Sequence, residues 1–368
     1  MAEILDKYNL PVFIYNNGLY KESEYQKFKN VVFYTLPISY PTKPRRPLVY
    51  LAKVIWPKII IKFNSLLFKK NIIIGVDLIG YLIASRSFKY KPELTHYISF
   101  ELLFKDEMKN NNKFFKLKIL EEKFLKMGLK SLLIQDAYRQ DLFLKENLGL
   151  TIDHTFLLPV APSPYKSALS STLTKARKEK IKVIYAGSIY AWSGINEIID
   201  VFEKMNNANF ELHIHSRFAL NVDHPLVEKI SALKNKGIQI NMSSKELAFT
   251  ELYEFLKNFD IGIATYFPVS DPGIYDGLNM QEIGLSSGKF STYMMLGLPT
   301  IVSPTTSFNN LRKKYSFGEI IYGFDGLENS LIKIADHYEA YSNDCKKLYN
   351  KELNPDLYIG SYVDNILN

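Results

Sequence analysis

The stretch GLSSGKFSTYMMLGLPTIVSP, residues 284–304, decides the fold assignment. Two serines, a glycine and a lysine stand immediately before a short apolar run that ends at Gly-Leu-Pro, and the apolar segment PTIVSP follows. This order predicts a short buried helix followed by a strand. A helix start offers unpaired amide groups and the positive end of the helix dipole, and small residues let an anion approach them closely.

The cluster Ser286, Ser287, Gly288 and Lys289 therefore predicts a phosphate site, and we expect the diphosphate of a nucleotide there. Lys289 adds a full positive charge to the helix start. The alternative is an ordinary serine cap on a buried helix, with Lys289 pointing into water. The rest of the chain bears on the choice between these two interpretations.

Short apolar runs alternate with amphipathic stretches along most of the chain, which is typical of a buried parallel sheet separated by helices. The strand candidates of the first half are PVFIY (11–15), VVFYTL (31–36), NIIIGV (71–76), THYISF (95–100), SLLIQD (131–136) and TFLLPV (155–160). Those of the second half are IKVIYAG (181–187), NFELHIHS (209–216), IQINM (238–242), DIGIATY (260–266), PTIVSP (299–304) and GEIIYG (318–323). The series predicts an α/β protein with two tandem Rossmann-like, doubly wound domains.

A chain of 368 residues is the right length for two such domains. The stretch VAPSPYKSALSSTLTKARKEK (160–180) interrupts the alternation with prolines, serines and a basic run. We therefore expect an N-terminal domain over residues 1–162, a linker over 163–180 and a second domain over 181–344.

Composition excludes several classes of protein. The single cysteine, Cys345, rules out an intrachain disulfide and a thiolate metal cluster. The start MAEILDKYNL lacks the pattern of a signal peptide, so we expect a cytoplasmic protein. The apolar span 49–68 contains three lysines and a proline and should not cross a bilayer.

The formal net charge of +8 is unevenly distributed. No acidic residue occurs between Tyr25 and Val76, whereas residues 43–70 mix lysines and arginines with bulky apolar side chains. This mixture suits an anionic membrane surface, with the protein peripheral on the inner face of the membrane. The alternative is a solvated helix whose lysines extend their heads into water. No pattern in the chain predicts nucleic-acid binding.

Three segments of the second domain stand out, namely IKVIYAGSIYAWSGINEIIDVFEKM (181–205), DIGIATY (260–266) and SSGKFSTYMMLGLPTIVSP (286–304). In this order and spacing they resemble the donor domain of GT-B glycosyltransferases, notably family 4 (group 1). Upstream, LEEKFLKMGLKSLLIQDAYRQDLFLKENLGL (120–150) and LLPVAPSP (157–164) resemble the end of that family's first domain. The resemblance covers about residues 75–304. It implies that the last helix, about residues 345–368, packs back on the first domain.

The resemblance also implies a nucleotide sugar in the cleft between the domains, an acceptor on the first domain, and no metal cofactor, because the helix dipole and basic side chains neutralise the leaving diphosphate. We find no Asp-x-Asp pair, and His213 and His215 have the spacing of residues that line a sheet face. The implied donor-site residues are Gly187, Ser188, Arg217, Glu282, Ser286, Ser287, Gly288, Lys289 and Thr292.

Two positions depart from the family pattern. The family's arginine and lysine that bind the diphosphate align with Ser188 and Ser193 of this chain. Arg217 would therefore help Lys289 to neutralise the phosphate charge. The departure indicates either weaker stabilisation of the leaving group or a different donor grip.

The glutamate that binds the ribose aligns with Thr292. Either Glu282 supplies the missing carboxylate or Thr292 makes a single hydroxyl contact with the ribose.

In the first domain, Asp77 and Glu101 each follow a strand candidate and are the candidate catalytic residues, to orient an acceptor hydroxyl or take its proton. The alternatives are a helix cap for Asp77 and a packed salt bridge for Glu101. We expect Arg139 to be a surface arginine on a helix, the alternative being a side chain that faces the cleft. The start of the chain resembles the family's second strand, so we expect its first strand and glycine loop to be missing, or rewired into VFIY (12–15).

Three functions fit these patterns. The first is a glycosyltransferase that moves a sugar from a nucleotide diphosphate to a hydroxyl of a lipid-linked surface glycan. The second is a non-catalytic relative that binds a nucleotide sugar or a glycan-assembly partner, which the departures favour. The third is a sugar epimerase of similar double α/β build.

Overall fold

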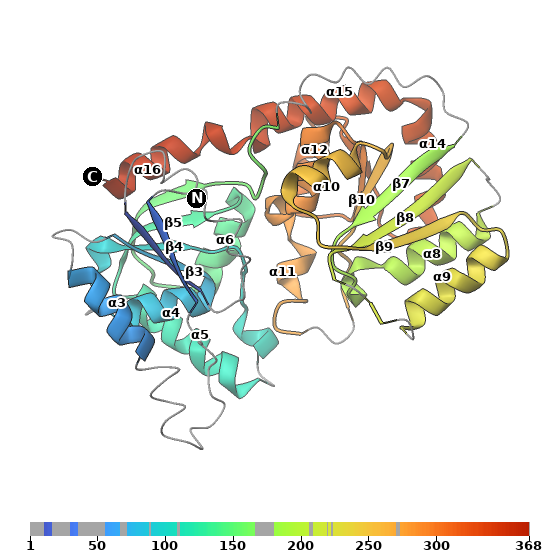
Figure 1. Ribbon diagram of the computed structural model, residues 1–368. Coiled ribbons are helices and arrows are strands. Elements are labelled where there is room, and N and C mark those ends of the chain that lie inside the picture. Colours follow the sequence, from blue (N-terminus) through green and yellow to red (C-terminus); the bar gives the residue numbers. More distant parts are fainter. Residues whose placement is uncertain are drawn as a thin grey trace.

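The computed structural model describes the larger part of the chain, and its ribbon forms two α/β bodies side by side (Figure 1). The described residues are 11–16, 30–35, 56–66, 72–87, 90–108, 111–165, 180–205, 209–218, 220–221, 224–269 and 273–367. The expected linker over 163–180 lies mostly outside this set. Of the basic segment 43–70, the structure describes residues 56–66.

The second body is built on a six-stranded parallel sheet in the order β12-β11-β10-β7-β8-β9. Its strands are β7 (Ile181–Ala186), β8 (Phe210–Ser216), β9 (Ile240–Ser244), β10 (Ile261–Ala264), β11 (Thr300–Val302) and β12 (Gly318–Ile320). The chain winds outward from β7 to β9, then restarts beside β7 and winds the other way. This is the doubly wound arrangement, and it confirms the expected fold class.

Helices cover both faces of this sheet (Figure 1). One apolar cluster joins strand residues such as Leu212 and Ile263 to α8 (Ile195–Lys204), α9 (Pro225–Asn235) and α14 (Leu327–Asp336). The opposite cluster includes side chains of α10 (Phe249–Leu256), α12 (Gly288–Leu296), α13 (Thr306–Arg312) and α15 (Tyr338–Leu348). Burial on both faces explains why β7, β10 and β11 are mostly apolar, whereas β8 and β9, towards one edge of the sheet, also carry polar residues.

The first body contains a four-stranded parallel sheet in the order β3-β4-β5-β6. Its strands are β3 (Ile73–Val76), β4 (Thr95–Ile98), β5 (Leu129–Ile134) and β6 (Ile152–Leu157), and its helices are α3 (Trp56–Leu66), α4 (Asp77–Ser87), α5 (Asn112–Leu125) and α6 (Ala137–Glu146). Strands β1 (Val12–Asn16) and β2 (Val31–Thr35) form a separate parallel pair. Residues 1–10, upstream of β1, lie outside the described set, so the missing first strand stays a prediction.

Short helical turns complete the secondary structure of the described residues. They are the 3-10 turns η3 (Pro92–Leu94), η4 (Lys105–Met108), η5 (Ala191–Ser193), η6 (Gly284–Ser286), η7 (Phe324–Gly326) and η9 (Pro355–Leu357), the π-helical turn η8 (Tyr349–Leu353), and the four-residue helix α11 (Leu278–Gln281). In Figure 1, α11 lies between the two bodies.

The C-terminal segment links the two bodies (Figure 1). Helix α15 packs on the second body, with Cys345 fully buried there. The following helix, α16 (Ile359–Leu367), packs Tyr362 and Val363 against Ile98 and Leu133 of the first body. Within the residues that the structure describes, no helix is both long enough and apolar enough to span a bilayer.

Candidate functional site

The point where the winding of the second sheet reverses lies between β7 and β10. Gly262 of β10 pairs with Ile184 of β7 on one side and with Thr300 of β11 on the other. In open α/β sheets, ligands bind outside the carboxyl ends of the strands at such a reversal. The loop after β7 and the start of α12 meet at this place, and the quoted motif 284–304 contains that start.

A tyrosine of α12 fixes the helix over the reversal point. The ring of Tyr293 lies directly on Gly262, where an added Cβ would come within 2.5 Å of Cδ2 of the tyrosine. The phenol oxygen of Tyr293 accepts a hydrogen bond of 3.0 Å from the amide of Ala186. Glycine in DIGIATY is therefore required by close packing, and this packing aims the start of α12 at the carboxyl end of β7.

The start of α12 is only partly capped. Ser287 is the N-cap, and its Oγ accepts from the amide of Phe290 at 3.2 Å and contacts the phenol oxygen of Tyr266 at 2.6 Å. Among the described residues, no backbone carbonyl or cap side chain accepts from the amides of Gly288 and Lys289. These two amides remain available to an anion at the positive end of the helix.

Lys289 does not extend into water. Part of the Lys289 side chain or backbone is exposed, but its Nζ atom is buried and has no hydrogen-bond partner among the described residues. Nζ lies 3.6 Å from the ring centroid of Tyr185 and 5.3 Å from that of Tyr266. Desolvation by burial lowers the pKa of Lys289 to about 7. A buried cation without a counter-charge is unfavourable and marks a place that an anionic ligand would stabilise.

The glycine after β7 lies against this lysine. A Cβ at Gly187 would come within 2.9 Å of Lys289 Cε and 3.3 Å of Nζ. The next carbonyl, of Ser188, accepts from the phenol of Tyr185 at 2.7 Å. The structure thus brings together Gly187, Ser188, Ser287, Gly288 and Lys289 at the reversal point.

Other expected donor residues are engaged elsewhere. Arg217 is exposed and pairs with Glu246 at 3.0 Å. Thr292 donates its hydroxyl to the carbonyl of Gly288 at 2.8 Å. The carboxylate of Glu282 accepts from the amide and the hydroxyl of Thr306 at 2.9 and 3.2 Å, so it caps α13.

Ser286 turns towards the first body rather than towards a phosphate. Its hydroxyl donates to the carbonyl of Phe100 at 3.1 Å. The expected cluster of four residues is therefore divided between the helix start, with Ser287, Gly288 and Lys289, and the contact between the two bodies.

Asp77 and Glu101 lie at the carboxyl ends of β3 and β4, beside that contact. Asp77 has a positive φ of 51°, which is strained for a residue other than glycine. Its Oδ1 accepts from the amides of Phe100 and Glu101 at 2.7 and 3.0 Å, so it holds the loop after β4. Glu101 Oε2 accepts from the side-chain amide of Asn279 at 2.5 Å. Burial is the main cause that raises the pKa of both carboxyl groups.

The expectation for Arg139 is wrong, because its side chain is fully buried where the two bodies meet. Its guanidinium donates to the carbonyls of Phe100, Asn279 and Glu282 at 2.8, 3.3 and 3.0 Å. Helical position alone suggested a surface residue, since the second body that covers this face of α6 is distant in sequence. Asn279 was missed as well, and no sequence motif marks it.

Further bonds join the two bodies near α11. Glu107 Oε1 accepts from the amide of Leu278 at 2.7 Å. Asp136 Oδ2 accepts from the amide of Leu285 at 3.1 Å, and the carbonyl of Leu285 accepts from the amide of Val160 at 2.8 Å. The segment before α12 is therefore attached to the first body by both side-chain and backbone hydrogen bonds.

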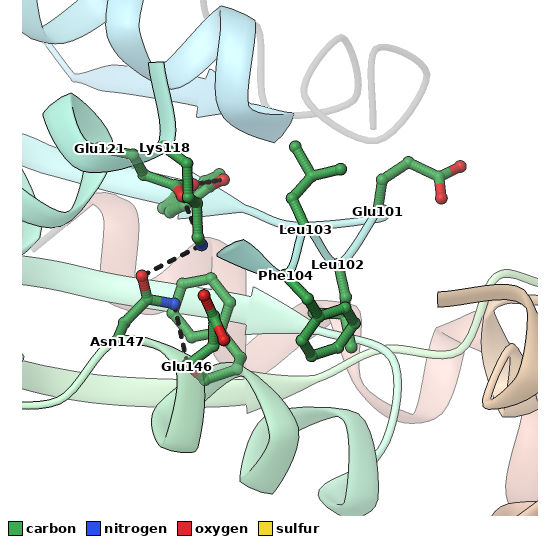
Figure 2. A pocket seen from close by; sticks show the side chains of 10 residues that line it. Glu101, Leu102, Leu103, Phe104, Lys118, Glu121, Glu146 and Asn147 are labelled. Atoms are coloured by element: carbon green, nitrogen blue, oxygen red, sulfur yellow. Dashed lines mark hydrogen bonds and ion pairs between the residues drawn. The ribbon is translucent and has the colours of Figure 1, made fainter. Parts of the chain in front are cut away.

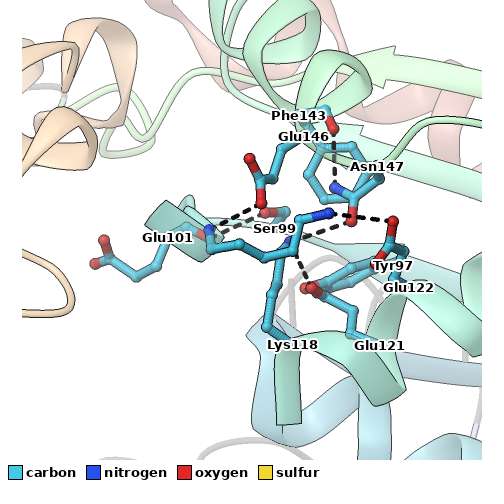
Figure 3. A network of polar contacts seen from close by, with 10 residues as sticks. Tyr97, Ser99, Glu101, Lys118, Glu121, Glu122, Phe143, Glu146 and Asn147 are labelled. Carbon is cyan, nitrogen blue, oxygen red and sulfur yellow. Dashed lines mark hydrogen bonds and ion pairs between the residues drawn. The ribbon is translucent and has the colours of Figure 1, made fainter. Parts of the chain in front are cut away.

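A separate polar cluster lies inside the first body. A cavity of about 10 Å³ lies between α5 and the loop after β4, which is room for about one water molecule. Figure 2 shows the side chains that line it. Lys118 there pairs with Glu121 at 2.7 Å and donates to Asn147 at 3.1 Å (Figure 3). The cavity is too small for a nucleotide sugar. No group of three or more His, Cys, Asp and Glu side chains in the described residues is arranged to hold a metal ion.

No protein-family model and no curated protein matches the sequence. Solved structures do match the fold over nearly the whole chain. WaaG, a glycosyltransferase involved in lipopolysaccharide biosynthesis, matches with a TM-score of 0.66 at 14% identity, covering 99% of this chain and 93% of WaaG. Anabaena HepE, in complex with UDP-glucose, matches with a TM-score of 0.65 at 12% identity, covering 100% and 94% of the two chains.

A glycosyltransferase from Rickettsia africae gives a TM-score of 0.66 at 12% identity, covering 99% of this chain and 92% of that one. Identities this low establish the fold, and the specific assignment to family 4 stays a prediction. The two parallel sheets, the reversal point and these three structures together show that the chain has the GT-B fold of glycosyltransferases.

Proposed function

We propose that the protein is a metal-independent glycosyltransferase that uses a nucleotide diphosphate sugar. The observation that carries this proposal is the buried, unpartnered Nζ of Lys289 beside the free amides at the start of α12. A diphosphate there would supply the missing counter-charge and accept hydrogen bonds from both amides. The leaving diphosphate would be stabilised by the same groups, without a metal ion.

Residues of the first body would activate the acceptor hydroxyl. The acceptor oxygen would form a bond to the anomeric carbon of the sugar, while the bond from that carbon to the diphosphate oxygen breaks. Glu101 would orient the acceptor hydroxyl and take its proton. Asp77 would hold the loop that carries Glu101, because its Oδ1 already binds the amides of Phe100 and Glu101.

A lipid-linked surface glycan is the acceptor we propose, with the protein peripheral on the inner face of the membrane. WaaG, of the same fold, is described as involved in lipopolysaccharide biosynthesis. Helix α3 exposes Ile59, Phe63 and Leu66 by 51, 64 and 75%, at a spacing that puts them on one face. Such a face within a basic segment favours an anionic bilayer, and sedimentation with phosphatidylglycerol against phosphatidylcholine vesicles measures this preference.

Calorimetric titration with UDP, GDP and ADP tests the donor site. We expect one of them to bind the wild-type protein, and Lys289→Met to weaken that binding by about 1.5 to 3 kcal/mol, as for hydrogen bonds to charged groups. Lys313→Met is the matched control, since Lys313 is exposed on the far end of α13 and bonds Asn310. No binding of any of the three, or equal losses in both variants, would refute the proposal.

A non-catalytic binder of nucleotide sugars is the second candidate. Ser188 and Ser193 stand where the resemblance implies two phosphate-binding cations, and Glu282 is engaged in capping α13. This candidate predicts diphosphate binding without any release of nucleoside diphosphate from a panel of UDP, GDP and ADP sugars. Slow turnover with water as the acceptor would exclude it.

A further inference from the structure

Asn279 of α11 is fully buried between the two bodies and uses both ends of its side-chain amide. Its Oδ1 accepts from the amide of Leu102 at 2.8 Å and from Arg139 Nη2 at 3.0 Å. Its Nδ2 donates to Glu101 Oε2 and, at 3.2 Å, to the carbonyl of Tyr275. Leu102 and Arg139 offer only donors, so the oxygen of the amide must face them and the nitrogen must face Glu101.

Arg139 in turn cannot move without breaking several bonds. Its Nε donates to Gln135 at 3.0 Å, and its two terminal nitrogens donate to Asn279 and to the carbonyls of Phe100 and Glu282. All of these acceptors are neutral oxygens. The guanidinium therefore fixes the orientation of Asn279 and ties α11 to the loop that follows β4.

Glu101 is held by both bodies at once. Asp77, from the first body, binds its backbone amide at 3.0 Å, and Asn279, from the second, binds Oε2. Its other oxygen, Oε1, accepts no hydrogen bond from the described residues, and Figure 3 shows the side chain pointing away from the cluster around Lys118. The charged groups that act on Glu101 are Asp77, Arg139 and Asp276.

We propose that Asn279 is a positioning residue, by which the donor-binding body orients the Glu101 carboxylate of the acceptor body so that Oε1 is presented to the acceptor hydroxyl. The inference rests on the proposed function. It implies that the reactive carboxylate is correctly oriented only while the two bodies are docked through α11. Binding energy at the donor body is thereby coupled to the geometry of the acceptor site.

Asn279→Asp is the sharpest test, because it keeps an oxygen for Leu102 and Arg139 and replaces the nitrogen that donates to Glu101 and to the carbonyl of Tyr275. The donor becomes a carboxylate, so Glu101 loses a hydrogen bond and gains a like charge. We expect the titration midpoint of Glu101, followed by carbon-13 NMR of the labelled carboxyl and assigned with Glu101→Gln, to rise by about one pH unit or more. An unchanged midpoint would overturn the inference.

Turnover gives the second readout. With UDP-glucose as the probe and UDP release as the signal, we expect Asn279→Asp to lower kcat on the order of 10²-fold, to leave KM for UDP-glucose unchanged, and to shift the rising limb of the pH profile upwards. A merely structural role would change stability alone and leave the pH profile in place.

The double variant Glu101→Gln/Asn279→Asp separates docking from chemistry. The amide at position 101 donates to the carboxylate at position 279, so the hydrogen bond is restored with its direction reversed. We expect thermal stability to recover to the wild-type value while kcat stays low. Recovery of kcat as well would show that Glu101 only joins the two bodies, and it would overturn the inference.

The two proposals fail in different ways. If no nucleoside diphosphate binds the wild-type protein, the proposed function fails, whatever the NMR titration gives. If diphosphate binds and UDP-glucose turns over, but Asn279→Asp leaves kcat and the pH profile unchanged, this inference fails and the proposed function stands. Binding without any turnover in the wild-type protein overturns the inference and favours the non-catalytic candidate.

Discussion

Two buried lysines, one in each body, show opposite environments. Lys118 is 2% exposed, forms an ion pair with Glu121 at 2.7 Å and donates to Asn147, inside the cluster of Figure 3. The Nζ of Lys289 is also buried, but it faces two aromatic rings and has no hydrogen-bond partner in the described residues. Both contribute a cation to the interior, and only the first has a counter-charge there.

If the proposed function is correct, this difference distinguishes a structural lysine from a ligand-binding one. In the first body, the buried cation is already paired with side chains of the protein, so a ligand would gain no new interaction with it. The second body leaves its cation unsatisfied at the reversal point of a doubly wound sheet, where ligands of such folds bind. Burial of a charged side chain therefore does not by itself mark a candidate ligand site. The mark is a buried charged group that has no counter-charge or hydrogen-bond partner within the described residues.

The largest expected effect is on Lys118. Lys118→Met leaves Glu121 buried without its cation, and we expect the free energy of unfolding to fall by about 3–5 kcal/mol. Urea denaturation followed by circular dichroism measures it. Adding Glu121→Gln removes the unpaired charge and keeps an acceptor for the buried Tyr97 hydroxyl, so it should restore part of the loss. A loss below about 1 kcal/mol in the single variant would contradict a stabilising role for the Lys118–Glu121 ion pair.

Lys289→Met should have the opposite sign. In the ligand-free protein it removes a buried cation that nothing neutralises, and we expect unfolding to cost about 1–4 kcal/mol more than in the wild type. The folded pKa of about 7 lies below the unfolded value of 10.5, so the gain is full at pH 7 and below and shrinks as pH rises towards 10. Denaturation at pH 6 and 9 tests both points, and a destabilised variant would contradict them.

The smallest expected effect is the pH dependence of donor binding. Below pH 7 Lys289 is already protonated, whereas above it the bound diphosphate must draw a proton onto the amine. We expect the affinity for UDP-glucose to fall by up to about tenfold per pH unit above pH 7, and the calorimetric heat to depend on the buffer. Lys289→Met should abolish this dependence. A wild-type affinity that is flat between pH 7 and 9 would argue against an amine in contact with the diphosphate.

Much of the architecture can be predicted from local sequence patterns. Runs rich in apolar residues marked every strand of the second sheet, because helices cover both faces of that sheet and bury most of its side chains. The start of α12 could also be predicted from sequence. Its cap, the hydrogen bond from the amide of Phe290 to the hydroxyl of Ser287, joins residues that are three positions apart.

Local patterns of residues are therefore enough to predict the α/β class, the two parallel sheets and the serine-capped start of α12. Which polar groups remain unsatisfied depends instead on how distant elements pack. Lys289 Nζ of α12 is buried against Tyr185 of β7 and Tyr266, two residues past the end of β10, and Arg139 and Asn279 meet across 140 residues of chain. Such contacts depend on how separate elements pack, and no local pattern of side chains encodes them.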